Sequence, residues 1–472
     1  ELQNAAEVLP AKQYDLYKKA KKSDKPVTII SVEDIGNDYK NKSNTWNYRA
    51  SEITEFAFGL SDHYAWNCAK VDVDDREIFV TTTYNVSHDE EPNEMVNRQL
   101  QYIKYFSESM PGVPYPFPEF KSFIVGSGGA AGGAMIERLW GTDMHNMLHQ
   151  YIPRYVRINE KHFTWMDEGL LDFNTTYLQR KLSPNGERII IEGYDNVPVL
   201  GSMEDLPLMA SSRYMDNTRN SQAPISLTEF IFSMLYHELG HEIFTKAYRE
   251  FIITWAKKSP TPYDLFNTFE RISGRELDWF WNPWFFNFGD VDLAISSLDN
   301  GKLIVSKLGT RPVPVVVNVS HEDGTTWKKD FKVSVWKDKN QIIVDIPKSK
   351  NVSTIGVNSQ LPDGNIFNNY YPKLKERYDD FKIADDFLGK YNIKEIPLKA
   401  SIELKNDLVF MTIMGQGESR EAFFTPINDN KFESLTGEYT LTLKKDNSNN
   451  GISFILKKDS WQGNLTGQKS NQ

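Results

Sequence analysis

Two histidines and one glutamate constrain the fold of this chain more than any other feature of its sequence. His145 and His149 are four residues apart, so on a helix their side chains lie on one face, one turn apart. Residues 150–167 separate them from Glu168, which lies in a Trp-Met-Asp-Glu-Gly segment. Two imidazoles from one helix and a carboxylate from the next can form a zinc site with one open position. The spacing therefore predicts two neighbouring helices that hold a zinc ion.

The residue after the first histidine conflicts with a catalytic role for this site. In the His-Glu-x-x-His motif of metallopeptidases, glutamate follows the first histidine and acts as general base. Here that position is Asn146. An amide can orient a water molecule but has no carboxylate to accept its proton. The alternative without metal is a pair of hydrogen-bonded histidines on a buried helix, with Glu168 capping the next helix.

Length, charge and cysteine content restrict the class of protein. At 472 residues the chain is too long for one domain, and we expect three or four. Its net charge of −10 argues against nucleic acid as a partner. No apolar run reaches the length of about 18 residues that a membrane span needs. The single cysteine excludes an internal disulfide. Because the first residue is Glu1 and not methionine, we expect a processed or trimmed product that has lost an export signal, and hence an extracytoplasmic protein that is periplasmic or secreted.

The sequence patterns of the first 290 residues predict two regions. Residues 1–90 contain apolar, β-branched segments at 26–32 and 77–84, and we expect a remnant of an N-terminal β domain. A small self-contained α+β unit is the alternative. Residues 91–290 have mainly helical spacing. One short strand is expected at 120–125, and helices are expected at 92–110, 144–151, 168–181, 227–257, 263–273 and 276–287.

The last 180 or so residues are richer in strand patterns. Residues 291–370 predict a β-sandwich of the immunoglobulin-like kind. Its strands are expected at 302–308, 313–319, 331–335, 341–346 and 353–357. Residues 371–390 are charged and predict a helical linker. Short strands separated by turn residues then predict a small C-terminal barrel or curled sheet, so that the linker and this β domain together occupy 371–472.

A complete His-Glu-x-x-His motif occurs elsewhere, at His237, Glu238 and His241. It lacks a third ligand, because Pro260 stands where the glutamate would be needed. Both histidines also fall in an apolar series with helical spacing, which is typical of a helix packed on its neighbours. We therefore interpret this motif as structural. An active peptidase centred on it is the competing hypothesis.

Several separate stretches resemble one family of peptidases. They are TWMDEGLLDFNTTYL around Glu168, Gly-Ala-Met at 133–135, FSMLYHELGHEIFTKAYREFI, and SGRELDWF followed by PWF. These stretches are similar to parts of the gluzincin aminopeptidases, the family of membrane alanyl aminopeptidase. The resemblance covers residues from about 40 to about 370.

The resemblance implies a multidomain α+β protein. A thermolysin-like, mainly helical domain would lie between β domains: a partial N-terminal domain, a β-sandwich and a small C-terminal domain. The zinc ligands would be His145, His149 and Glu168, and the ligand would be a peptide or protein. The substrate-binding loop would begin at Gly133, Ala134 and Met135.

Two further positions depart from the family pattern. The glutamate that holds the free amine of the substrate corresponds to Ile136, and Glu137 is one place away. The tyrosine that stabilises the transition state corresponds to Ile225, and Tyr214 is the nearest alternative. Loss of a general base alone typically costs about a hundred- to ten-thousand-fold in rate. We therefore predict a zinc-binding, metallopeptidase-like pseudoenzyme with weak or no peptidase activity. A non-catalytic binding or assembly module with this fold, and an active peptidase, are the alternatives.

Overall fold

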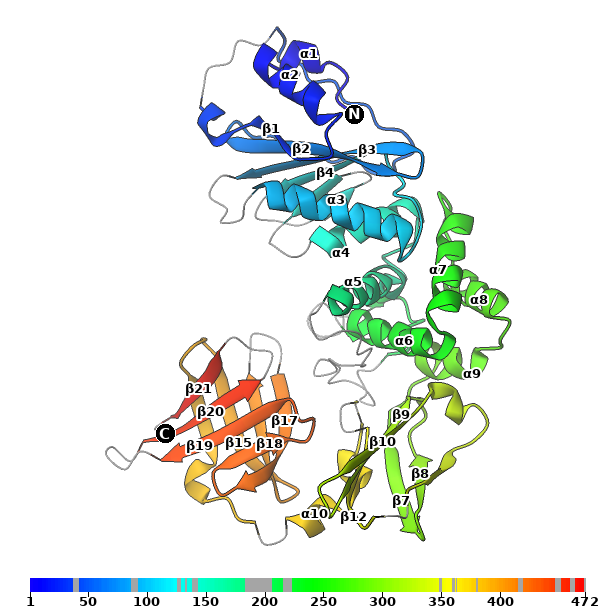
Figure 1. Cartoon of the computed structure of the whole chain (residues 1–472), viewed down its shortest axis with the longest axis vertical. Coiled ribbons are helices and arrows are strands. Elements are labelled where there is room, and N and C mark those ends of the chain that lie inside the picture. Colours follow the sequence, from blue (N-terminus) through cyan, green and yellow to red (C-terminus); the bar gives the residue numbers. More distant parts are fainter. Residues whose placement is uncertain are drawn as a thin grey trace. The chain divides into compact units, whose positions relative to one another are not determined.

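The computed structural model describes residues 1–36, 42–85, 92–124, 129–131, 134–137, 143–182, 206–214, 223–347, 350–358, 361, 363–378, 381–414, 419–445, 451–458 and 463–470. The chain forms two compact units, drawn in Figure 1. The first comprises Glu1–Arg188, Ser211–Arg213 and Leu239–Leu277. The second comprises Ile189–Ala210, Tyr214–Glu238 and Asp278–Gln472. In the described part of the chain, no helix combines the length and the apolar character needed to cross a membrane.

A mixed sheet organises the first unit, with the strand order β1-β2-β3-β4-β6-β5. Its strands are β1 (Val27–Ile30), β2 (Tyr64–Val73), β3 (Arg76–Asn85), β4 (Glu119–Ile124), β5 (Gly129–Ala131) and β6 (Ala134–Glu137). β3 and β4 run parallel, and the helix α3 (Pro92–Glu108) connects them. Parallel neighbours need such a crossover. The sheet therefore joins strands from both sides of residue 90, where the sequence suggests a domain boundary.

Helices cover both faces of this sheet (Figure 1). α1 (Ala5–Val8) and α2 (Ala11–Ala20) pack on one face through Tyr17, Cys68 and Phe79. α3 covers the other face, where Met95 contacts Ala65 and Tyr84. Side chains alternate between the faces of a strand, so Ala65 and Cys68 of β2 serve opposite layers. Further helices of the unit, among the described residues, are α4 (Asp143–Leu148), α5 (Leu170–Leu182), α7 (His241–Trp255) and α8 (Pro262–Ser273).

The helix expected at 227–257 is two helices, and this prediction was wrong. α6 (Ala223–Leu239) ends one residue before Gly240, and α7 begins one residue after it. Gly240 has φ 82° and ψ 161°, a conformation that is essentially restricted to glycine and cannot continue a helix. Hydrophobic spacing continues through the break, which is why the pattern predicts one helix.

Two smaller sheets follow in the second unit, after the short helix α9 (Asp278–Trp281). One has the order β10-β9-β12-β13 and the other β11-β8-β7. The strands are β7 (Leu293–Asp299), β8 (Lys302–Lys307), β9 (Val315–His321), β10 (Thr326–Phe331), β11 (Gln341–Asp345), β12 (Val352–Val357) and β13 (Tyr370–Tyr371). The strand expected at 331–335 is instead a 3₁₀ turn, Val333–Trp336. Val333 and Trp336 are both buried, and their i,i+3 spacing suits three residues per turn.

The C-terminal region is a closed eight-stranded barrel, which is one of the two forms that the sequence predicts. It comprises β14 (Gly389–Ile393), β15 (Lys399–Lys405), β16 (Leu408–Met414), β17 (Ser419–Asn428), β18 (Lys431–Ser434), β19 (Tyr439–Lys445), β20 (Ile452–Lys458) and β21 (Asn464–Lys469). The helical linker predicted at 371–390 is reduced to α10 (Leu374–Arg377) and a turn at Asp385–Phe387. Ile383 and Phe387 belong to the apolar core of the barrel, so this segment covers the barrel and does not continue as a helix. The structure thus confirms a mixed α+β, multidomain chain with a helical region and a barrel.

Candidate metal centre

His145 and His149 keep the spacing that the sequence predicts, although the helix is short. α4 ends at Leu148, but the backbone of His149 is still helical and its N–H donates to the carbonyl of His145 at 3.3 Å. The two imidazoles therefore stay on one face, with ring centroids 4.9 Å apart and planes at 85°. The chain leaves the helix at Ile152, which is extended because Pro153 follows.

Glu168 comes from a wide helical turn, Trp165–Gly169, that leads into α5. Apolar packing holds this turn in place. Trp165 is buried and stacks on Phe266 of α8 at 5.9 Å between ring centroids. Before the turn, the backbone N–H of Thr164 donates to Oγ of Ser212 at 3.1 Å. A rigid support of this kind lowers the conformational free energy needed to orient the Glu168 side chain as a metal ligand.

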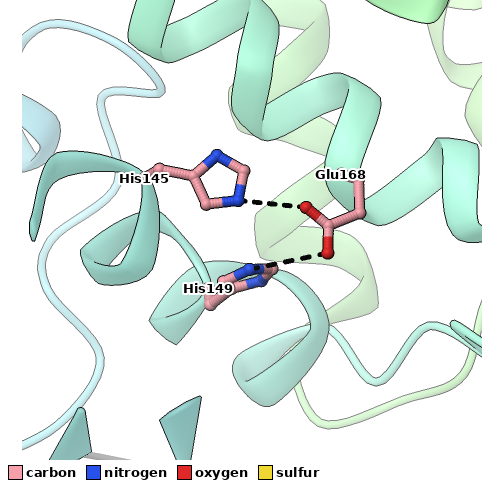
Figure 2. Close-up of side chains that lie close together, drawn as sticks. All are labelled: His145, His149 and Glu168. Carbon is pink, nitrogen blue, oxygen red and sulfur yellow. Dashed lines mark hydrogen bonds and ion pairs between the residues drawn. The ribbon is translucent and has the colours of Figure 1, made fainter. Parts of the chain in front are cut away.

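The three predicted ligands lie together (Figure 2). Nε2 of His145 is 3.0 Å from Oε2 of Glu168, and Nε2 of His149 is 3.9 Å from Oε1 of the same carboxylate. One ligand atom from each of the three residues lies within 4.8 Å of the others. The same nitrogen of each ring thus faces one carboxylate.

Two further carboxylates hold the opposite nitrogens of the rings. Nδ1 of His145 is 3.0 Å from Oδ1 of Asp172, and Nδ1 of His149 is 3.1 Å from Oδ1 of Asp167. A carboxylate that accepts Nδ1–H fixes the tautomer and turns Nε2 towards the centre. Sequence reasoning missed both aspartates. Asp172 is four residues after Glu168 and so lies on the same helical face, which is the signal that could have found it.

The electrostatics of the centre favour protonated histidines when no ion is bound. Burial alone would lower the pKa of His145, but the hydrogen-bonded carboxylates of Asp172 and Glu168 outweigh it and raise this pKa to about 10. The pKa of His149 is also raised, because Asp167 and Glu168 outweigh its burial. Burial would raise the pKa of Glu168, yet the two histidines lower it. Burial raises the pKa of Asp167 against the opposing effect of His149.

This donor set fits a metal ion. Two imidazole nitrogens and one carboxylate are ligands that Zn²⁺ accepts, and three protein ligands leave a further position open. The carboxylates behind both histidines are the usual companions of metal-bound imidazole. His145, His149 and Glu168 form a partly buried group that could hold a metal ion.

The other predicted site residues are described only in part. Asn146 lies on α4 and is half-buried. Ala134, Met135 and Glu137 form β6, which runs parallel to β4, but the structure describes their backbone only. Gly133 lies outside the described residues.

Tyr214 ends a short helical turn, Ser212–Tyr214, and its side chain also lies outside the described part. The proposed roles of Glu137 and Tyr214 therefore stay predictions.

The motif at His237 does not form a helical pair of ligands. His237 lies near the end of α6, whereas His241 begins α7 and is exposed. Glu238 is buried and accepts a hydrogen bond from the backbone N–H of Ser334 at 3.1 Å. Among the described residues, the groups with metal-ligand geometry do not include any of these three side chains.

Comparison with known proteins gives little further information. No protein-family model matches the chain, and no curated protein matches it. Among solved structures it is similar to aminopeptidase A of Legionella pneumophila, crystallised in complex with aspartic acid, with a TM-score of 0.49 and 15% sequence identity. The match covers 60% of this chain and 35% of that one. At this TM-score the likeness is too weak to support an inference about fold or function.

Proposed function

We propose that this protein binds one zinc ion through His145, His149 and Glu168, and that it is an aminopeptidase-like protein with weak or no peptidase activity. The observation that carries the proposal is the orientation of the two imidazoles. Both Nε2 atoms face the Glu168 carboxylate, and both Nδ1 atoms are held by aspartates. The motif resemblance around Glu168 supports the peptidase type, with a peptide or protein as ligand. An extracytoplasmic location is part of the proposal and rests on the sequence expectation alone.

The residues around the centre explain why catalysis would be weak. Zinc, when bound, would supply a Lewis acid that polarises a carbonyl oxygen. Asn146 follows the first histidine and can donate or accept a hydrogen bond but cannot take a proton from water. Glu168 is committed to the two histidines, and Asp167 and Asp172 accept hydrogen bonds from their Nδ1 atoms. Glu168 is therefore occupied as a ligand, and the two aspartates have a positioning role.

Metal content tests the first half of the proposal. We expect one zinc per chain by elemental analysis in the wild-type protein, and at least a hundredfold weaker zinc binding in His145→Ala. A wild-type protein without zinc, together with a His145→Ala variant of unchanged stability and unchanged metal affinity, would refute the metal centre.

Turnover tests the second half. Wild-type protein, Asn146→Glu and Asn146→Gln should be assayed with aminoacyl and short peptide substrates in the presence of zinc. Glutamine matches glutamate in size but provides no base, so it is the matched control. We expect little or no turnover in wild type and Asn146→Gln, and a gain only in Asn146→Glu. Robust turnover by the wild-type protein would overturn the assignment as a degenerate peptidase.

A further inference from the structure

A second group of acidic side chains lies beside the histidine centre. Glu160, Asp167 and Glu168 each place a carboxylate oxygen within 4.8 Å of the others. Two oxygens bound to one Ca²⁺ at about 2.4 Å can be at most about 4.8 Å apart, so this separation suits a shared ion. The group contains only oxygen donors, which Ca²⁺, Mg²⁺ and Mn²⁺ prefer to the nitrogen-rich set chosen by zinc.

Asp167 provides an independent indication that a cation binds beside these three carboxylates. Its side chain is completely buried. Oδ1 pairs with Nδ1 of His149, but Oδ2 is buried without a hydrogen-bond partner among the described residues. A buried carboxylate oxygen without a partner destabilises the fold unless an ion or a proton compensates it. One oxygen of this carboxylate is also within reach of oxygens from Glu160 and Glu168.

Glu160 is held where it can complete such a site from the solvent side. Its side chain is exposed, but its backbone is fixed at both ends. Its N–H donates to the carbonyl of Ile158 at 3.0 Å, and its carbonyl accepts from Oγ1 of Thr164 at 2.9 Å. An ion bound here could therefore keep water molecules on its open side, as hard divalent ions usually do.

The charge balance of the whole centre also favours a second cation. Four carboxylates, those of Glu160, Asp167, Glu168 and Asp172, together carry a charge of −4 when ionised, and one zinc ion would reduce it to −2. A second divalent ion would bring it to zero. Arg154 acts on Glu160 and Asp167 at longer range, but its Nε pairs with Glu55 at 3.0 Å.

We propose that Glu160, Asp167 and Glu168 form a second site, specific for a hard divalent cation, which shares the Glu168 carboxylate with the histidine centre. Carboxylate-bridged pairs of ions about 3.5–4 Å apart are a known arrangement in two-metal sites. The inference goes beyond the proposed function, because it requires neither peptidase activity nor an ion on the histidines.

The test uses Mn²⁺ as the probe. Full-length protein is stripped with a chelator and loaded with one equivalent of zinc. Mn²⁺ is then titrated in, and the free ion is measured by electron paramagnetic resonance. We expect one further Mn²⁺ per chain, displaced by Ca²⁺. Glu160→Gln should weaken this binding at least tenfold and leave the zinc bound. Because Glu160 is exposed, this variant should fold normally.

Two other variants separate the possible outcomes. Asp15→Asn removes a charge from an exposed pair with Lys18 and should leave Mn²⁺ binding unchanged. His145→Ala removes only the first centre and should retain the Mn²⁺ site, even if zinc binding fails. The proposal is overturned if zinc-loaded protein takes up no Mn²⁺, if Glu160→Gln binds it as wild type does, or if His145→Ala abolishes it.

Discussion

Nδ1 of His149 lies 3.1 Å from Oδ1 of Asp167, and the side chain of Asp167 is completely buried. This pair fixes which nitrogen of His149 faces Glu168. A charged acceptor also makes the ring a stronger ligand than a neutral acceptor would. The role of Asp167 in metal binding can therefore be separated from its role in packing by a change that preserves its shape.

Asp167→Asn should weaken zinc binding by about ten- to a hundredfold, the usual cost of altering a residue behind a metal ligand. The amide keeps an acceptor for Nδ1–H but loses the charge. Competition with a chelator of known affinity measures the change. Asp172→Asn is the matched variant for His145 and should have an effect of similar size. If both variants bind zinc as tightly as wild type, the two aspartates do not orient the ligands.

Zinc affinity should increase with pH. Without metal, the pKa of His145 is raised to about 10, so this ring holds its proton at pH 7, and the carboxylates of Asp167 and Glu168 also raise the pKa of His149. Zinc requires neutral imidazole as its ligand. Zinc must displace one proton from His145 at any pH well below 10. Each pH unit between 6 and 9 therefore makes this displacement about tenfold easier, and the zinc affinity should rise by the same factor. Proton release on adding zinc, followed with an indicator dye, provides a second measurement. An affinity independent of pH would contradict the hydrogen-bond pattern of the centre.

Sequence spacing was sufficient to find the three central residues, because helical geometry converts a four-residue interval into a shared face. It also predicted a small C-terminal β domain, either a barrel or a curled sheet, because short strands and turns alternate regularly there. It missed Asp167 and Asp172. The four-residue interval from Glu168 indicates only that Asp172 shares its helical face, and the structure is what places both carboxylates behind the rings.

The break at Gly240 was missed for a different reason. The apolar positions on both sides continue with the same period, whereas the helix is interrupted by a single backbone conformation. The 3₁₀ turn at Val333–Trp336 has a similar origin. Val333 and Val335 are two residues apart, as in a strand, whereas Val333 and Trp336 are three apart, as in a 3₁₀ turn.

Glu238→Gln should leave zinc content, zinc affinity and any turnover unchanged. The Glu238 side chain accepts from the backbone N–H of Ser334, and a glutamine oxygen can replace that acceptor. We expect a loss of about 1 kcal/mol in the free energy of unfolding, which is typical of a weakened buried hydrogen bond. Glu168→Gln is the contrasting variant and should lose most of its zinc. If instead Glu238→Gln abolished activity, the catalytic centre would lie at the other motif.

Gly240→Ala tests whether the segment from His237 to His241 is a broken or a continuous helix. The change should lower the free energy of unfolding in the first case and raise it in the second. The backbone of Gly240 lies at φ 82° and ψ 161°, a region that alanine adopts only at a cost of about 1–3 kcal/mol. We therefore expect alanine to lower the free energy of unfolding by that amount, measured by urea denaturation. Were the two histidines instead on one continuous helix, as a pair of zinc ligands requires, alanine would stabilise that helix by up to about 1 kcal/mol.

Gly463→Ala is the control, because a Cβ atom at Gly463 meets no atom within 4 Å and its φ is ordinary. That change should alter stability by less than about 0.5 kcal/mol. Stabilisation by Gly240→Ala would therefore restore the motif as a candidate metal helix.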